Sequence, residues 1–231
     1  DLSRDDEAVA DIDAVFRRVP RYPLATYLSA LVMAKKKDWV GVQEAIQSVG
    51  RSLDNHMPSL FLSGAVHYAQ NQLEQAVRKL ERYVSAVPRN RRARKLLAAA
   101  LLRTRAAERA IEILQPLAEQ TSTDVQLLTL LGSAHMQVRK FNKGTEYFRR
   151  AAELSPNAAD IRTKLALGNL ARGQADTAVG QVEQALSIDP GARQAAALLA
   201  LVKLRRGADE GAIATARQLR ESMPDNPLPD N

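Results

Sequence analysis

The chain has 231 residues, 45% of them hydrophobic and 26% charged, and this balance is too apolar for a disordered segment. It contains no cysteine, which excludes disulfides, thiolate metal ligands and cysteine nucleophiles. Aromatic residues make up only 4%, and Ala and Leu dominate the apolar set, so the composition predicts an all-α protein. No run approaches the ~20 consecutive apolar residues of a transmembrane helix, and the first residues are unlike a secretory signal.

The net charge of +7 is concentrated in one segment. Between Arg89 and Arg109 the basic residues face a single acidic one, Glu108, and the rest of the chain is neutral. Such a segment favours an anionic partner, although a solvent-exposed helix start explains it without any ligand.

A period of 34 residues runs through the whole chain. Prolines that end helix-like runs are separated by multiples of 34, at Pro20, Pro88, Pro156, Pro190 and Pro224. No insertion breaks this register, which is the signature of a repeat array. We divide the chain into one helix in 1–22, the second helix of a truncated preceding repeat; six helix pairs in 23–56, 57–90, 91–124, 125–158, 159–192 and 193–226; and the start of a following repeat in 227–231.

Each pair is predicted to contain two antiparallel helices. In 125–158, apolar residues recur at helical spacing in 128–132 and again in 144–151, and Pro156 ends the second helix. Small residues let the two helices approach closely. The apolar back of one pair can be buried only by the next pair, so the pairs must stack.

Two local features of the repeat are its turn residues and a proline inside one helix. Asn71, Gly173 and Gly207 occupy the turn between the two helices of their pairs, where a left-handed backbone is expected. Pro116 lies inside a second helix and removes the amide that would bond Glu112, so a bend is expected there.

These features resemble the tetratricopeptide repeat (TPR), and the resemblance covers the whole chain. The family has a small residue in the first helix, another early in the second, a large apolar residue four later, and a terminal proline. Here Gly132, Gly144, Phe148 and Pro156 fill those places. The resemblance implies a right-handed α-solenoid of stacked antiparallel helix pairs, and a protein-interaction scaffold that binds a partner segment in its concave groove.

A narrower resemblance rests on three runs, at 20–32, 94–103 and 223–229. They resemble the TPR-repeat lipoproteins of the PEP-CTERM/exosortase exopolysaccharide systems of Gram-negative bacteria. This implies a protein of the periplasm or outer membrane, held by a lipid anchor on a cysteine outside this chain, which would be an internal piece. A cytoplasmic location is the alternative.

No pattern in the sequence predicts catalysis. His67 and His135 stand at the same repeat position two repeats apart, and His56 lies in a loop, so no two can share a metal or a proton relay. The sequence has no Gly-rich phosphate loop and no Ser/His/Asp set. We expect no enzyme activity, no cofactor and no metal.

The family lines its groove with the second, fifth, ninth, twelfth and thirteenth residues of each repeat. Carried over, these positions give an apolar and aromatic start, a basic third repeat and a polar fourth. The predicted partner-binding residues are Tyr27, Leu31, Phe61, Tyr68, Arg92, Lys95, Leu102, Arg103, Thr129 and Met136.

The twelfth position is apolar in every repeat, as at Tyr68, Leu102 and Met136. As a stripe along the groove, this row would suit a peptide with apolar anchors and an acidic group near the third repeat. The alternative is that the row packs against the second helices of its own pairs.

Two functions remain open at this point. The first is an interaction scaffold within an exopolysaccharide or protein-export system. The second is a binder of a polyanion, an acidic polysaccharide or nucleic acid, through the basic third repeat. Nucleic acid is disfavoured because helical repeats that read it need one base-reading set per repeat.

Both ends of the array are predicted to lack a polar cap. Val15 and Phe16 near one end and Ile213 and Leu219 near the other give each end an apolar strip. Such strips mark association surfaces, so we expect self-association through one or both ends.

Overall fold

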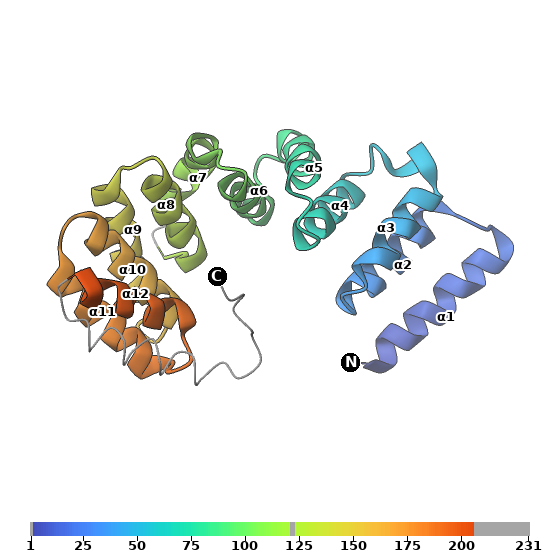
Figure 1. Cartoon of the computed structure of the whole chain (residues 1–231). Helices are drawn as coiled ribbons and strands as arrows, with labels where there is room; N and C mark the ends of the chain where they lie inside the picture. Colours follow the sequence, from blue (N-terminus) through green and yellow to red (C-terminus); the bar gives the residue numbers. More distant parts are fainter. Residues whose placement is uncertain (1, 121–122, 206–231) are drawn as a thin grey trace, which may run out of the picture. The chain divides into compact units, whose positions relative to one another are not determined.

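The computed structural model describes residues 2–120 and 123–205, and in them every element is helical (Figure 1). The predicted all-α class is confirmed. The helices are α1 Leu2–Arg18, α2 Pro23–Lys35, α3 Trp39–Ser48, the 3-10 helix η1 Gly50–Leu53, α4 Met57–Ala69, α5 Leu73–Ala86, α6 Arg91–Arg103, α7 Ala107–Gln120, α8 Val125–Gln137, α9 Phe141–Leu154, α10 Ala159–Ala171, α11 Ala175–Ile188 and α12 Arg193–Arg205.

The helices follow the predicted order of pairs, with one irregularity. The second helices α5, α9 and α11 each have 14 residues, whereas α3 has 10 and gives way to η1. Helix α7 runs continuously through Pro116. The second helix predicted within 193–226, the segment 227–231, and with them Gly207, Ile213, Leu219 and Pro224 lie outside the described residues.

In each of the first five pairs, the turn between the two helices has a left-handed residue at the same repeat position. Asn71 and Gly173 have φ of 61° and 78°, as predicted. The amide of Gln72 then donates to the carbonyl of His67 at 2.8 Å, which closes the helix end in a Schellman arrangement. The same conformation is held by residues less suited to it, namely Lys37, Arg105 and Arg139.

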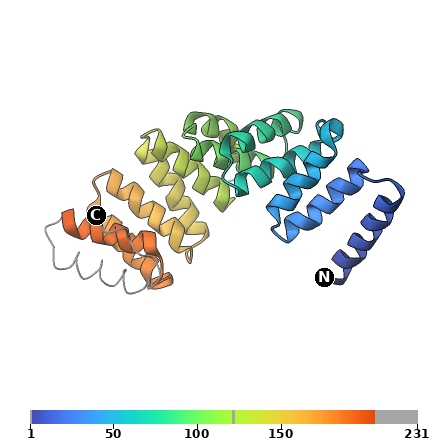
Figure 2. The same cartoon turned by 45° about the vertical axis from the view of Figure 1, so that its right-hand side comes forward.

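The chain divides into two compact units, 1–114 and 115–231, and each is described by itself. In the first unit, α2 contacts α3 and α4, and α4 contacts α5 and α6 (Figure 2). The helices cross at small residues: a Cβ on Gly64 would lie 2.7 Å from Cγ of Leu80. This close approach lets the pair bury its apolar side chains.

The second unit repeats the arrangement in α8 to α12, where α8 contacts α9 and α10 contacts α9 and α11. Gly132 on α8 faces Phe148 on α9, and Ala166 on α10 lies in one cluster with Val182 on α11. None of the helices in 2–120 and 123–205 is long and apolar enough to cross a membrane.

The N-terminal part of the first unit exposes apolar side chains. Val15 on α1 is exposed as predicted, and so are Leu24, Leu28 and Leu31 on α2, whereas Phe16 is half-buried. Val15, Leu28 and Leu31 help line an apolar hollow of about 380 Å³ between the two helices.

Candidate functional site

Helices α4 and α6 bring predicted aromatic and basic residues together. Phe61 and Tyr68 lie about two helical turns apart on α4, and Arg92 and Arg103 about three turns apart on α6, so each pair shares a face. The guanidinium carbon of Arg92 is 5.9 Å from the ring centre of Phe61, and that of Arg103 is 5.1 Å from Tyr68. Both contacts fall within cation–π range.

The second arginine is also held by a hydrogen bond that the sequence does not reveal. Nη2 of Arg103 donates to Oδ1 of Asn71 at 2.5 Å. The sequence predicts Asn71 only as a turn residue, whereas the structure places its side chain against Arg103 on α6. The guanidinium of Arg103 is therefore oriented while its side chain stays exposed.

The start of α6 is tied to the neighbouring aromatic residues. Oδ1 of Asn90 accepts from the amide of Ala93 at 3.0 Å and caps the helix, and Nδ2 of Asn90 donates to the Tyr83 hydroxyl at 2.9 Å. The Tyr83 ring lies 5.3 Å from Phe61. The ring that supports Arg92 is thus fixed by packing from α5.

Tyr27 on α2 extends the aromatic surface into the first pair. Its ring meets His56 edge-on, with centres 4.9 Å apart and planes at 78°. Burial, and to a smaller extent the nearby Tyr83 hydroxyl, raises the pKa of Tyr27. The Tyr27 phenol therefore stays neutral at physiological pH and can both donate and accept a hydrogen bond.

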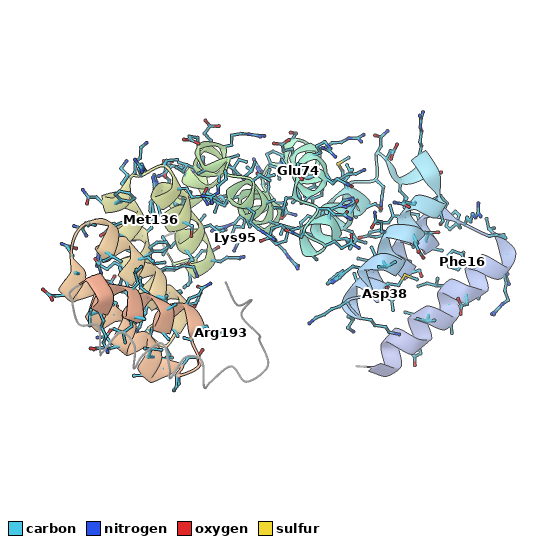
Figure 3. The ribbon with its side chains drawn as sticks, viewed as in Figure 1. Phe16, Asp38, Glu74, Lys95, Met136 and Arg193 are labelled. Atoms are coloured by element: carbon cyan, nitrogen blue, oxygen red, sulfur yellow. The ribbon has the colours of Figure 1, made fainter. Side chains whose placement is uncertain are left out.

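We call this surface the aromatic–basic face. Its aromatic members and Lys95 are half-buried, and Leu31 and the two arginines are exposed. Figure 3 labels Lys95 on α6. The face belongs wholly to the first unit and comprises Tyr27, Leu31, Phe61, Tyr68, Arg92, Lys95 and Arg103.

The structure does not expose every residue predicted for the groove. Leu102 is 7% exposed, so it is a buried residue and the predicted apolar stripe is broken there. Met136, labelled in Figure 3, packs beneath α9, where a Cβ on Gly144 would lie 2.8 Å from its sulfur. At Met136 the row therefore faces the second helix of its own pair, where Gly144 leaves room for a large side chain.

Thr129 and Met136 belong to the second unit. The hydroxyl of Thr129 donates to the carbonyl of Val125 at 2.8 Å, within its own helix. Neither residue is therefore part of the aromatic–basic face, which belongs to the first unit.

The histidines have structural surroundings. His67 is buried, and its Nδ1 lies 2.5 Å from Oε1 of Gln72. His135 is buried and stacked on Tyr147 at 5.4 Å. Burial first, and then the charges of Lys143 and Lys140, lower its pKa. In the described part of the chain, no group of three or more His, Asp or Glu residues is placed to hold a metal ion.

Comparison with known proteins agrees with the helix pairs. Family models described as "Tetratricopeptide repeat" match residues 67–134, 129–192 and 163–227, which together are more than half of the chain. No curated protein matches the sequence.

Several solved structures share the fold. A crystal structure of MamA is 23% identical, with a TM-score of 0.60, and the match covers 69% of this chain and 93% of that one. TTC0263, a thermophilic TPR protein of Thermus thermophilus, is 19% identical, with a TM-score of 0.64 and coverages of 74% and 93%. MamA from Desulfovibrio magneticus RS-1, from residue 41 to its end, is 12% identical, with a TM-score of 0.65 and coverages of 75% and 98%. The family matches, the 34-residue register and the shared helical fold establish that the chain belongs to the tetratricopeptide repeat family.

Proposed function

We propose that the chain is a protein-interaction scaffold that binds an acidic, partly apolar segment of a partner on the aromatic–basic face. Proteins of the tetratricopeptide repeat family act as interaction scaffolds, and a protein or peptide partner fits this fold. The observation that carries the proposal is the pair of exposed arginines, each stacked on an aromatic ring.

The physical argument concerns the free energy of ordering. Arg92 and Arg103 are already positioned by Phe61, Tyr68 and Asn71, so a carboxylate that meets them orders less side-chain rotation than it would on a free arginine. The ring faces beside them supply apolar contact area. An acidic group flanked by apolar residues uses both surfaces.

A capture experiment tests the proposal. The chain and its Tyr27→Ala, Phe61→Ala, Tyr68→Ala triple variant are used to recover partners from the envelope of the source organism. The triple variant should recover at least ~10-fold less of the main partner, because large aromatic anchors dominate such interfaces. A matched variant truncates two exposed apolar side chains of the second unit that lie outside the groove positions, Leu154 and Ile188, and should recover as much as the natural chain. Equal recovery by all three proteins would remove the aromatic–basic face as the main binding surface.

We further propose that this scaffold acts in an exopolysaccharide or protein-export system, in the periplasm or at the outer membrane, with a lipid anchor outside this chain. The support is the resemblance of the three runs at 20–32, 94–103 and 223–229 to the PEP-CTERM/exosortase lipoproteins. We propose no catalytic role, because the features that support the function are all binding features.

Binding of a polyanion is the second candidate, and the segment from Arg89 to Arg109 favours it. Two basic residues of this segment already have local partners, which weakens the case for a polyanion: Arg109 forms an ion pair with Glu81, and Arg103 bonds Asn71. Titration with duplex DNA and with an acidic polysaccharide at ~150 mM salt separates the two candidates. A dissociation constant tighter than about micromolar with a steep salt dependence would favour the polyanion.

A further inference from the structure

A hollow of about 350 Å³ opens between the first and second helix pairs of the first unit. Residues from α3, α4 and α5 line it. Its lining includes the apolar side chains of Val42, Ile46 and Val66 and the polar side chains of Ser63 and His67. None of the residues of the aromatic–basic face lines it, so it is a separate surface.

The repeat register explains why the hollow exists. Ser63 on α4 occupies a position that holds a leucine in each of the next four repeats. Those leucines are at most 7% exposed, and they are Leu97, Leu131, Leu165 and Leu199. In the later repeats, the leucine fills the space between consecutive pairs, as Leu199 does in the cluster that contains Val182. At Ser63 that side chain is missing.

The early end of α3 enlarges the gap. Helix α3 stops at Ser48, and Gly50 takes a left-handed φ of 55°. The corresponding position one repeat later is Val84, inside α5. The hollow therefore lies where Ser63 replaces a leucine and where α3 lacks its last turn.

The same hollow occurs one repeat earlier. Ser29 lies 34 residues before Ser63, and it lines a hollow of about 330 Å³ together with Phe16, Met33 and Ala45. Each of these four residues lies 34 positions before a residue that lines the Ser63 hollow. In both pairs a serine in place of leucine coincides with an unfilled space.

The rim of the Ser63 hollow offers unused hydrogen-bonding groups. The side chains of Gln43, Gln47, Asp54, Gln75 and Lys79 form no hydrogen bond or ion pair with another described residue. Amide, carboxylate and ammonium groups together can bind both the N–H and the C=O groups of a peptide main chain.

His67 adds one acceptor to this rim. Its Nδ1 must carry the hydrogen in its bond to Oε1 of Gln72, because an amide oxygen only accepts. In the tautomer that carries its hydrogen on Nδ1, Nε2 is an acceptor, and His67 lines the hollow while being only 7% exposed as a residue.

We propose that the Ser63 hollow is a docking pocket for a branched aliphatic side chain, leucine or isoleucine, presented by a protein partner whose main chain bonds the polar rim. The occupant is identified by what fills this position in the later repeats, a buried leucine between two helix pairs. The Ser29 hollow accepts a second apolar side chain of the same partner. Packed helices lie about 8–10 Å apart, so the two side chains are spaced by about two to three residues of an extended strand or about five to seven of a helix.

The test uses small capped amino acids as probes and NMR of the isotope-labelled full chain as the readout. N-acetyl-leucine methylamide should shift the signals of Ser63 and His67 with at least ~10-fold higher affinity than N-acetyl-alanine methylamide, because the leucine buries three more carbons. Equal affinities of the two probes would overturn the proposal. Tighter binding of free leucine than of its capped form would assign the pocket to a small zwitterion instead, and would also overturn it.

Matched variants tie the shifts to the pocket. Ser63→Leu introduces the residue that the next four repeats carry and should abolish binding of the capped leucine in the Ser63 hollow. Ser29→Leu should leave that binding unchanged. Ser63→Ala keeps the hollow open and should retain binding, and the circular dichroism spectrum of Ser63→Leu separates the expected loss of binding from a folding defect. Undiminished binding to Ser63→Leu with a natural circular dichroism spectrum contradicts the pocket. Because these residues lie outside the aromatic–basic face, the outcome is independent of the proposed function.

Discussion

Gly132 sets the separation of α8 and α9 at a single contact. A Cβ there would lie 2.5 Å from Cε1 of Phe148, which is 3% exposed and has little room to move. We expect Gly132→Ala to lower the free energy of unfolding by about 1–3 kcal/mol, as overpacking does in other cores. Gly180→Ala, where a Cβ meets nothing within 4 Å, should raise it by about 0.5–1 kcal/mol. Urea unfolding measures both.

The next repeat shows which second substitution should compensate for Gly132→Ala. One pair later, Ala166 and Val182 stand at the equivalent positions and are fully buried. The double variant Gly132→Ala, Phe148→Val should therefore lose less free energy of unfolding than the two single variants lose in sum. A strictly additive double variant would show that the ring does not cause the effect of Gly132→Ala.

His135 gives stability a pH dependence. Its folded pKa is lowered by burial and by Lys143 and Lys140, so the unfolded chain binds the proton more readily. Stability from this residue is therefore full above the unfolded pKa, near 6.5, and is lost as the pH falls below it toward the lower folded pKa.

We expect His135→Leu to flatten the dependence of the unfolding free energy on pH between about 7 and 5. Leucine suits the site because Leu101 holds the same repeat position and is fully buried. The change also removes Nδ1 of His135, a buried atom with no hydrogen-bond partner in the described structure. Chemical unfolding at several pH values measures the slope, and an unchanged slope would assign it to other groups.

At the level of the helices, the 34-residue period predicts most of what the structure contains. Proline phase and apolar spacing place α4 to α6 and α8 to α11 within their units, because each helix pair solves the same packing problem. The period fails at α3, since it predicts a longer second helix, whereas α3 ends at Ser48.

The aromatic–basic face could be predicted only in part. The groove positions select Phe61, Arg92 and Arg103, but equivalent positions do not have equal burial. Tyr68 is half-buried, while Leu102, also a twelfth residue, is a core side chain. Which residue turns outward depends on side-chain packing between helices, and a single sequence does not encode that as a pattern.

At the scale of the whole molecule, self-association stays a prediction, and the exposed apolar side chains of α1 and α2 support it. Leu28 is 49% exposed and helps line the hollow of about 380 Å³. Leu28→Glu should weaken concentration-dependent association by about tenfold or more, because it puts a charge on a surface that association would bury. Light scattering across concentration measures this.

Leu154→Glu is the matched control, since Leu154 is similarly exposed at 43% but lies on α9 in the second unit. It should leave association unchanged. A natural chain that stays monomeric at every concentration would contradict the association itself, and equal effects of the two variants would contradict its location.

The left-handed turns offer a route to a more heat-resistant protein. Lys37, Arg105 and Arg139 repeat one turn at intervals that are multiples of 34 residues, and each holds a backbone conformation that glycine adopts without steric cost. Replacing each with glycine should raise the free energy of unfolding by about 0.5 kcal/mol. This is the relief of steric strain in the folded turn minus the cost of the extra entropy that glycine has in the unfolded chain. Sites this far apart in a repeat array should contribute additively, so the triple variant should raise the melting temperature by several degrees in calorimetry. If the three gains do not add, the turns unfold in separate steps rather than in one cooperative transition.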